Sequence, residues 1–238
     1  MKIALSLGVT IALLSHASAH WIFADLLTGS PDVTVANRDA VRYVLDYTPV
    51  LDVTSSDITC NRLPRGFSNT TVAIEAGANV GFRSVFSDRD KPEPIWHPGP
   101  LSFYLGRVPP GQTAKTWDGK GENWFKISEQ TATSNFGSFA GWPASHKSDL
   151  FATIPRSTPS GEYLLRIEHI AIHNPSAPQF YVSCAQIEVT NGGAGNPSPL
   201  VSIPGYIKPN DPAFDIDFLH DTSVTAWKVP GASSIWQG

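Results

Sequence analysis

The chain has 238 residues, of which 41% are hydrophobic, and a formal net charge of −4. This length supports one sizeable core and lies within the range of a single all-β domain. No basic stretch is long enough to indicate nucleic acid or an anionic membrane as a partner, so we expect neither.

The first 19 residues have the pattern of a secretory signal peptide. Lys2 precedes an apolar run over 3–14, and Ala17-Ser18-Ala19 provides the small-x-small pattern that signal peptidase accepts. The run is too short for a stable membrane anchor; a buried N-terminal strand or helix is the alternative interpretation. We expect removal of 1–19 and a secreted, extracellular protein that begins at His20 with a net charge of −5.

The remaining sequence is strand-like and rich in turn residues, with 20 Pro and 19 Gly in the whole chain. Segment 71–86 alternates apolar residues on both sides of Gly77-Ala78, which predicts a β-hairpin. Alternation also predicts strands over 101–108, 149–154, 161–173 and 178–190, whereas 114–129 is expected to hold a turn or two of helix. Many short strands at regular spacing predict a β-sandwich or barrel. Of the two we expect the sandwich, antiparallel and of the immunoglobulin or fibronectin type, with long surface loops.

The last part of the chain is predicted to belong to the same domain. Residues 191–199 have a linker-like composition, but 200–221 keep apolar residues at irregular intervals, as an extended tail packed on a sandwich would. We therefore expect one domain over 20–238 and no carbohydrate-binding module. The sequon Asn69-Thr70-Thr71 predicts N-glycosylation of Asn69 on a loop.

Cys60 and Cys184 are the two cysteines of the chain. An even count in an oxidising compartment favours a disulfide. A pair of metal thiolates is the alternative, but the CxxC spacing typical of such sites is missing. We interpret the pair as structural.

A histidine at the amino terminus has a chemistry that an internal histidine lacks. Its α-amine, with an ordinary pKa of about 7.7–8.0, and its ring Nδ1 can chelate one metal together. With a third nitrogen from another imidazole, such a set suits a tetragonal or T-shaped copper site better than tetrahedral zinc. Alternatively, His20 is a residue that signal peptidase tolerates and binds nothing.

Other polar residues are candidates to complete such a site. His97 lies in "WHPGPLSFYL", on a loop bounded by Pro and Gly just before a predicted strand. Gln179 and Tyr181 share parity, so a strand would point both to one face. His173 precedes them across a Pro-containing turn that would return it to the same patch. His169 shares parity with His173 and is either part of that network or a structural or surface histidine.

These motifs together resemble a known family. The signal peptide before a histidine, the "HPGP" motif, "RIEHIAIH", "QFYVSCAQI" and the late "IPGYIKPNDPAFDI" are similar to the fungal lytic polysaccharide monooxygenases of auxiliary activity family nine. The resemblance covers essentially the whole mature chain, and "QFYVSCAQI" is its most specific stretch.

The resemblance implies a single copper ion held in a histidine brace. His20 would contribute its amine and one ring nitrogen, and His97 the third nitrogen. Tyr181 would lie at the axial position, while His173 and Gln179 would donate hydrogen bonds to oxygen or peroxide at the open position.

The resemblance also implies roles for residues away from the copper, and the sequence differs from the family's usual pattern at two places. Cys60 and Cys184 match the family's disulfide, and Tyr206 matches a surface aromatic that stacks on the substrate. The connection from His173 to Gln179 is shorter than usual, and His169 replaces a residue that is usually aliphatic.

The implied activity is oxidative cleavage of a β-1,4-glucan, either cellulose or hemicellulose, by hydrogen abstraction at C1, C4 or both. It requires O2 or H2O2 and an external electron donor, which is a small reductant or a redox protein. We expect a monomer with exposed aromatic rings on a flat face, and with Trp21 packed inside rather than on that face. Two alternatives are a secreted copper-binding protein that has the brace but no oxygenase activity, and a non-catalytic wall-binding module.

Overall fold

The computed structural model describes residues 20–30, 32–86 and 89–238. The predicted signal peptide, residues 1–19, lies outside the described residues. The described residues form ten strands: β1 (Ile22–Ser30), β2 (Val33–Asn37), β3 (Val72–Glu75), β4 (Asn79–Val85), β5 (Leu101–Arg107), β6 (Glu122–Gln130), β7 (Asp149–Thr153), β8 (Gly161–Ala171), β9 (Gln179–Thr190) and β10 (Val201–Ser202). The helices are short: η1 (Arg38–Ala40), α1 (Asp57–Cys60), η2 (Phe139–Gly141) and η3 (Pro212–Phe214). None of the helices in the described ranges has the length and apolar character needed to cross a membrane.

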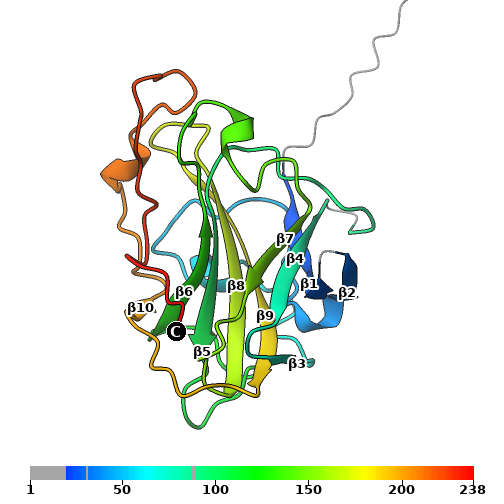
Figure 1. Cartoon of the computed structure of the whole chain (residues 1–238). Coiled ribbons are helices and arrows are strands. Elements are labelled where there is room, and N and C mark those ends of the chain that lie inside the picture. The colour runs from blue at the N-terminus through cyan, green and yellow to red at the C-terminus, as the bar shows by residue number, and fades with distance from the viewer. Residues whose placement is uncertain (1–19, 31, 87–88) are drawn as a thin grey trace, which may run out of the picture.

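The strands form two sheets that face each other, as the sequence predicted (Figure 1). One sheet has the order β2-β1-β4-β7 and the other β10-β6-β5-β8-β9-β3. All pairs are antiparallel except β3 and β9, which are parallel. The fold is therefore an all-β sandwich, with the long hairpin β8–β9 in the larger sheet.

The larger sheet is buried on both faces, which explains the composition of its central strand β8. Tyr163, Leu165 and Ile167 point into the core between the sheets. Leu164 and Ile170 point to the opposite face, into a second apolar cluster. A strand covered on both sides can keep its apolar side chains out of water at every position, so β8 is buried almost continuously.

The second cluster is covered by long loops and by the C-terminal segment. Ile203, Ile207, Phe214 and Phe218 are buried there, which confirms an extended tail packed on the sandwich. In Figure 1 this segment, coloured orange to red, runs along the β10 and β6 side of the sheet. The predicted disulfide is present: Cys60 at the end of α1 is bonded to Cys184 of β9, with Cα atoms 5.2 Å apart.

Two local predictions were wrong. Segment 71–86 is not a hairpin, because β3 pairs with β9 in the larger sheet and β4 pairs with β1 and β7 in the smaller one. Gly77, with φ of +89°, lies where the chain passes from one sheet to the other, so both halves still point apolar residues into the same core. Segment 114–129 holds turns followed by strand β6 rather than helical turns.

Candidate metal centre

His97 is positioned by the loop 97–100, which lies against strand β8. The amides of Ile170 and Ile172 donate hydrogen bonds to the carbonyls of Pro100 and Pro98, at 3.1 and 3.0 Å. Gly99 makes this approach possible, since a Cβ there would lie 1.9 Å from the Ile170 carbonyl oxygen. The prolines and this glycine in "HPGP" thus hold His97 at the end of the larger sheet.

His173 lies beside His97 in spite of the short connection to Gln179. Their rings stack with centroids 4.0 Å apart and planes 16° from parallel. The C-terminal segment holds the turn of the β8–β9 hairpin in place. The Ser176 amide donates a hydrogen bond to the Phe214 carbonyl, and the Ser176 hydroxyl donates one to the Asp215 carboxylate, both at 2.8 Å. The Nδ1 of His173 is buried without a hydrogen-bond partner. Burial, and secondly the charge of His20, lower the pKa of His173, which favours the neutral imidazole.

Tyr181 and Gln179 point to one side of β9, as their parity predicted. The Tyr181 hydroxyl donates a hydrogen bond to Gln179 Oε1 at 3.0 Å, which leaves the Gln179 amide nitrogen as a donor. Burial raises the pKa of Tyr181 well above its ordinary value, so the phenol stays protonated. Behind it, the Trp21 ring stacks on Tyr181 with centroids 4.3 Å apart and is 1% exposed, which confirms that Trp21 is packed inside.

His20 completes the cluster at the start of β1. Its ring centroid is 6.0 Å from that of His97, with planes 85° apart, and 6.0 Å from that of Tyr181. An imidazole nitrogen binds a first-row metal at about 2 Å, so two rings that share one ion have centroids up to about 6.5 Å apart. The separation of His20 and His97 therefore fits a shared metal ion.

Side chains alone do not complete a metal site here. Within the part of the chain that the structure describes, no three His, Cys, Asp or Glu side chains are grouped closely enough to hold a metal. His20 and His97 offer two imidazole rings, and the backbone nitrogen of His20 is a candidate for a third donor. That nitrogen becomes a ligand only as a free amine.

His169 lies underneath the cluster rather than on the surface. It is fully buried, and its ring lies 5.3 Å from that of Trp21 and 6.3 Å from that of Tyr181. Burial, followed by the nearby charges of His97 and His173, lowers the pKa of His169 to about 3. His169 is therefore neutral at ordinary pH and is not a surface histidine, while its contacts with Trp21 and Tyr181 agree with a structural role and with membership of the network.

The prediction that Tyr206 stacks on a substrate does not agree with its surroundings. Its hydroxyl donates a hydrogen bond to the buried carboxylate of Glu168 and accepts one from Arg166 at 3.1 Å. Its ring packs edge-on against Tyr104, on the face of the larger sheet that is turned away from Tyr181. Tyr206 thus anchors the C-terminal segment to a buried ion pair.

Two exposed aromatic residues near the cluster, Tyr47 and Trp96, could not be singled out from the sequence with equal ease. Tyr47 lies 5.8 Å from His20, ring to ring, is 38% exposed and stacks on Phe86. Trp96 directly precedes His97 and is 42% exposed. The position of Trp96 beside a ligand candidate was a usable signal, whereas Tyr47 comes near His20 only through the tertiary fold.

Comparisons with known proteins identify the family of this chain. The family model described as Auxiliary Activity family 9 (formerly GH61) matches residues 20–227, so the match starts at His20. The chain is 42% identical to "AA9 family lytic polysaccharide monooxygenase H" from Malbranchea cinnamomea, covering 98% of this chain and 99% of that protein. It is 38% identical to "AA9 family lytic polysaccharide monooxygenase A" from Thermothelomyces thermophilus, covering 94% and 97%. The crystal structure of a cellulose-active polysaccharide monooxygenase from M. thermophila superposes with a TM-score of 0.76 at 26% identity, covering 92% of this chain and 100% of that one. The chain therefore belongs to auxiliary activity family 9, the copper-dependent lytic polysaccharide monooxygenases.

Proposed function

We propose that the protein is secreted, is cut before His20, and oxidatively cleaves β-1,4-glucan with one copper ion. The copper would be held by the His20 amine, a His20 ring nitrogen and a His97 ring nitrogen. The single observation that carries this proposal is the facing pair of His20 and His97 rings, beside which the terminal amine of His20 is the proposed third donor. The start of the family match at residue 20 supports the same boundary.

Bound copper supplies redox chemistry, cycling between Cu(II) and Cu(I) and activating O2 or H2O2 for oxidation of a sugar C–H bond. The protein's own part is to position this chemistry. The neutral phenol of Tyr181, fixed by Gln179 and by the Trp21 ring, would limit access to the bound ion from the Tyr181 side. His173 and the amide of Gln179 provide hydrogen-bond donors for a polar oxygen species beside the ligands.

Substrate contact is assigned to exposed rings beside the cluster instead of to Tyr206. Tyr47 and Trp96 each expose about two fifths of their surface. Tyr47 lies beside the His20 ring, whereas Trp96 precedes His97 in the chain and packs its ring edge-on against His146. Aromatic rings give apolar contact to the faces of sugar rings with little loss of side-chain freedom. Tyr47 is therefore the first candidate for contact with a polymer chain beside the ligands, and Trp96 the second.

The test is product analysis with the chain that begins at His20. Amorphous cellulose is incubated with the copper-loaded protein and ascorbate, and soluble oligosaccharides are analysed by mass spectrometry for aldonic acids from C1 attack and ketones from C4 attack. His97→Ala should abolish both products, while melting curves without copper should remain close to the parent because His97 is on a loop outside the core.

Two outcomes would contradict the proposal. Products that persist at the parent level in His97→Ala would show that His97 is not a ligand. Tight copper binding with no oxidised products on cellulose or hemicelluloses would favour the secreted copper-binding protein. The presence of His173, Gln179 and Tyr181 around the ligands is the feature that argues against that second interpretation.

A further inference from the structure

A cavity of about 670 Å³, separate from the candidate metal centre, lies against the outer face of β1. It is lined mainly by two segments, 38–43 and 65–70, together with Ala24 and Arg89. None of the metal-centre residues contributes to it. Its size is within the range of about 300–1,000 Å³ that is typical of small-ligand sites.

The lining of this cavity has an excess of positive charge. Four arginines contribute to it, whereas Asp39 is the single carboxylate among its lining residues. Arg38 is paired with Asp25 at 2.6 Å. Among the described residues, no carboxylate lies within ion-pair distance of Arg42, Arg65 or Arg89.

Arg42 is the deepest of these cations. It is fully buried and donates to neutral acceptors, namely the carbonyls of Ala114 and Trp117 at 3.0 and 2.5 Å and Gln186 Oε1 at 3.3 Å. Burial lowers the pKa of Arg42 to about 10, so it still carries its charge at neutral pH. A buried cation that is held by neutral groups favours an anion in the adjoining cavity.

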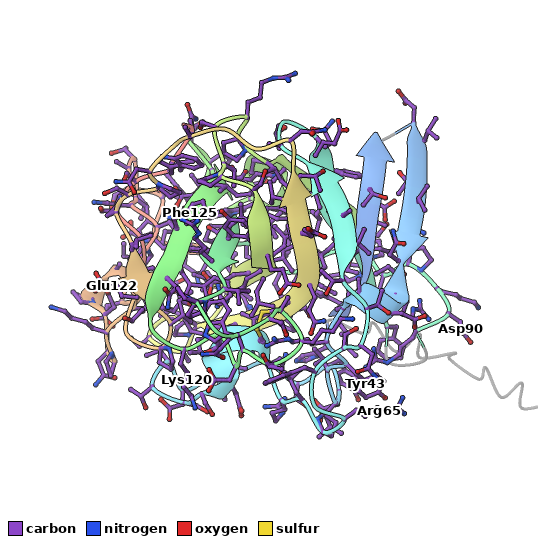
Figure 2. The ribbon with its side chains drawn as sticks, turned by 90° about the horizontal axis from the view of Figure 1, so that it is seen from below. Tyr43, Arg65, Asp90, Lys120, Glu122 and Phe125 are labelled. Atoms are coloured by element: carbon purple, nitrogen blue, oxygen red, sulfur yellow. A yellow bond between two sulfur atoms is a disulfide. The ribbon has the colours of Figure 1, made fainter. Side chains whose placement is uncertain are left out.

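The guanidinium groups are held in place by aromatic rings. Arg65 and Arg89 lie over the ring of Tyr43 at 3.9 and 4.0 Å, and Arg42 lies over Phe67 at 4.0 Å. Figure 2 shows Tyr43 and Arg65 together on one edge of the molecule. The N–H groups of Arg42 are used by its neutral acceptors, and Arg89 donates to the Val44 carbonyl. Arg65, stacked on Tyr43, therefore offers the accessible N–H edge for a carboxylate, and stacking reduces the freedom it loses on binding.

Neutral hydrogen-bonding groups line the same cavity. Thr70 is exposed and brings a hydroxyl group to it, beside Ser68, whose hydroxyl donates to the Asp39 carbonyl. Asn69 also lines the cavity but is not counted as a contact, because its side chain is the predicted glycosylation site. These groups match the hydroxyls of a sugar, while the arginines match a carboxylate. An inorganic anion would use the charges and leave most of the volume and the neutral groups without contact.

We propose that this cavity binds the carboxylate of a uronic acid residue, as found on acidic polysaccharides, with Arg65 as the accessible contact. Such a site would hold the protein on acidic regions of a polysaccharide without involving the metal. Binding does not depend on the oxidation proposed above, so the two can fail separately.

The test uses the purified metal-free protein and calorimetric or ligand-observed NMR titration. Glucuronic acid, glucose and inorganic phosphate are compared at equal ionic strength. We expect binding of glucuronate, weakened by added salt, and no binding of glucose. Arg65→Gln should weaken glucuronate binding about tenfold, and Arg65→Lys should retain part of the affinity, since charge is kept but the planar donor edge is lost.

Arg107→Gln is the matched control, because Arg107 is exposed at the end of β5 and lies outside the cavity. It makes the same charge change and should leave binding at the parent level. Because the Arg65 side chain is exposed and stacks only on Tyr43, its replacement should leave the fold intact, which unfolding curves would verify. Equal affinity for glucuronate and glucose, phosphate binding as tight as glucuronate, or an unchanged Arg65→Gln variant would each overturn the proposal.

Discussion

Replacement of Gly99 by alanine tests how the loop holds His97. The added Cβ would lie 1.9 Å from the Ile170 carbonyl oxygen and 2.9 Å from its carbon, where real contacts are at least 3.0 Å. The loop must therefore move away from β8 by about 1 Å to restore van der Waals contact.

The cost follows from what that movement disturbs. Insertion of an extra methyl group into a well-packed region lowers the free energy of unfolding by about 1–3 kcal/mol. The hydrogen bonds from Ile170 and Ile172 to Pro100 and Pro98 contribute about 0.5–1.5 kcal/mol each and would be weakened. We expect a loss of about 3 kcal/mol in the free energy of unfolding, which in a domain of this size lowers Tm by about 6–12 °C.

The metal centre should respond too, since His97 would move relative to His20 and His173. We expect copper affinity to fall about tenfold or more, as when groups that orient a metal ligand are changed. The assays are thermal unfolding of the metal-free chain and calorimetric copper titration of the chain that begins at His20.

Gly111→Ala is the control for this experiment. Gly111 also has a positive φ, +83°, but a Cβ there meets no atom within 4 Å. Gly111→Ala should lower the free energy of unfolding by about 1–2 kcal/mol through backbone strain alone, and it should leave copper affinity unchanged. If Gly99→Ala matched Gly111→Ala in both measurements, the close approach to β8 would not be what positions His97.

Three further changes probe the site and its surroundings. An extra alanine before His20 should greatly weaken copper binding in calorimetric titration, because the amine becomes an amide; equal affinity of the two forms would exclude the amine as a ligand. Gln179→Ala should slow the formation of oxidised products more than it lowers copper affinity, and a parallel fall of both would assign Gln179 to metal binding instead. Tyr206→Phe should cost about 1–3 kcal/mol in urea unfolding, because the buried Glu168 carboxylate loses a donor; a stacking residue would tolerate this change without loss.

Much of the fold could be predicted because β5, β7, β8 and β9 carry their apolar pattern locally. The sheet switch after β3 could not, since Ile74 and Val80 point into one core whether the chain makes a hairpin or crosses between sheets. Strand β1 was not predicted, for a different reason. A bulge between Phe23 and Asp25 breaks its alternation, so that Phe23 and Leu26 both face the core.

The grouping of residues in the candidate metal centre could be predicted where a sequence motif sets their positions. It could not be predicted where their neighbours come together only through the tertiary fold. His97, His173, Gln179 and Tyr181 lie together because two motifs meet at one end of the larger sheet. The surroundings of Tyr206 depend on Arg166 and Glu168, whose side chains point away from the core between the sheets. No pattern local to "IPGYIK" reveals that partner, so the exposure of its ring could not be judged from the sequence.

The long β8–β9 hairpin has a consequence for how the site moves. His173 lies two residues beyond the end of β8, and Gln179 is the first residue of β9, with Ala171 and Gln179 as the terminal pair of eleven. Movement of Gln179 would require fraying of this eleven-pair ladder, and the amide of Ile172, just before His173, is held by the Pro98 carbonyl. Backbone amides at this tip should therefore exchange with deuterium nearly as slowly as those of the sheet interior, although the tip borders solvent.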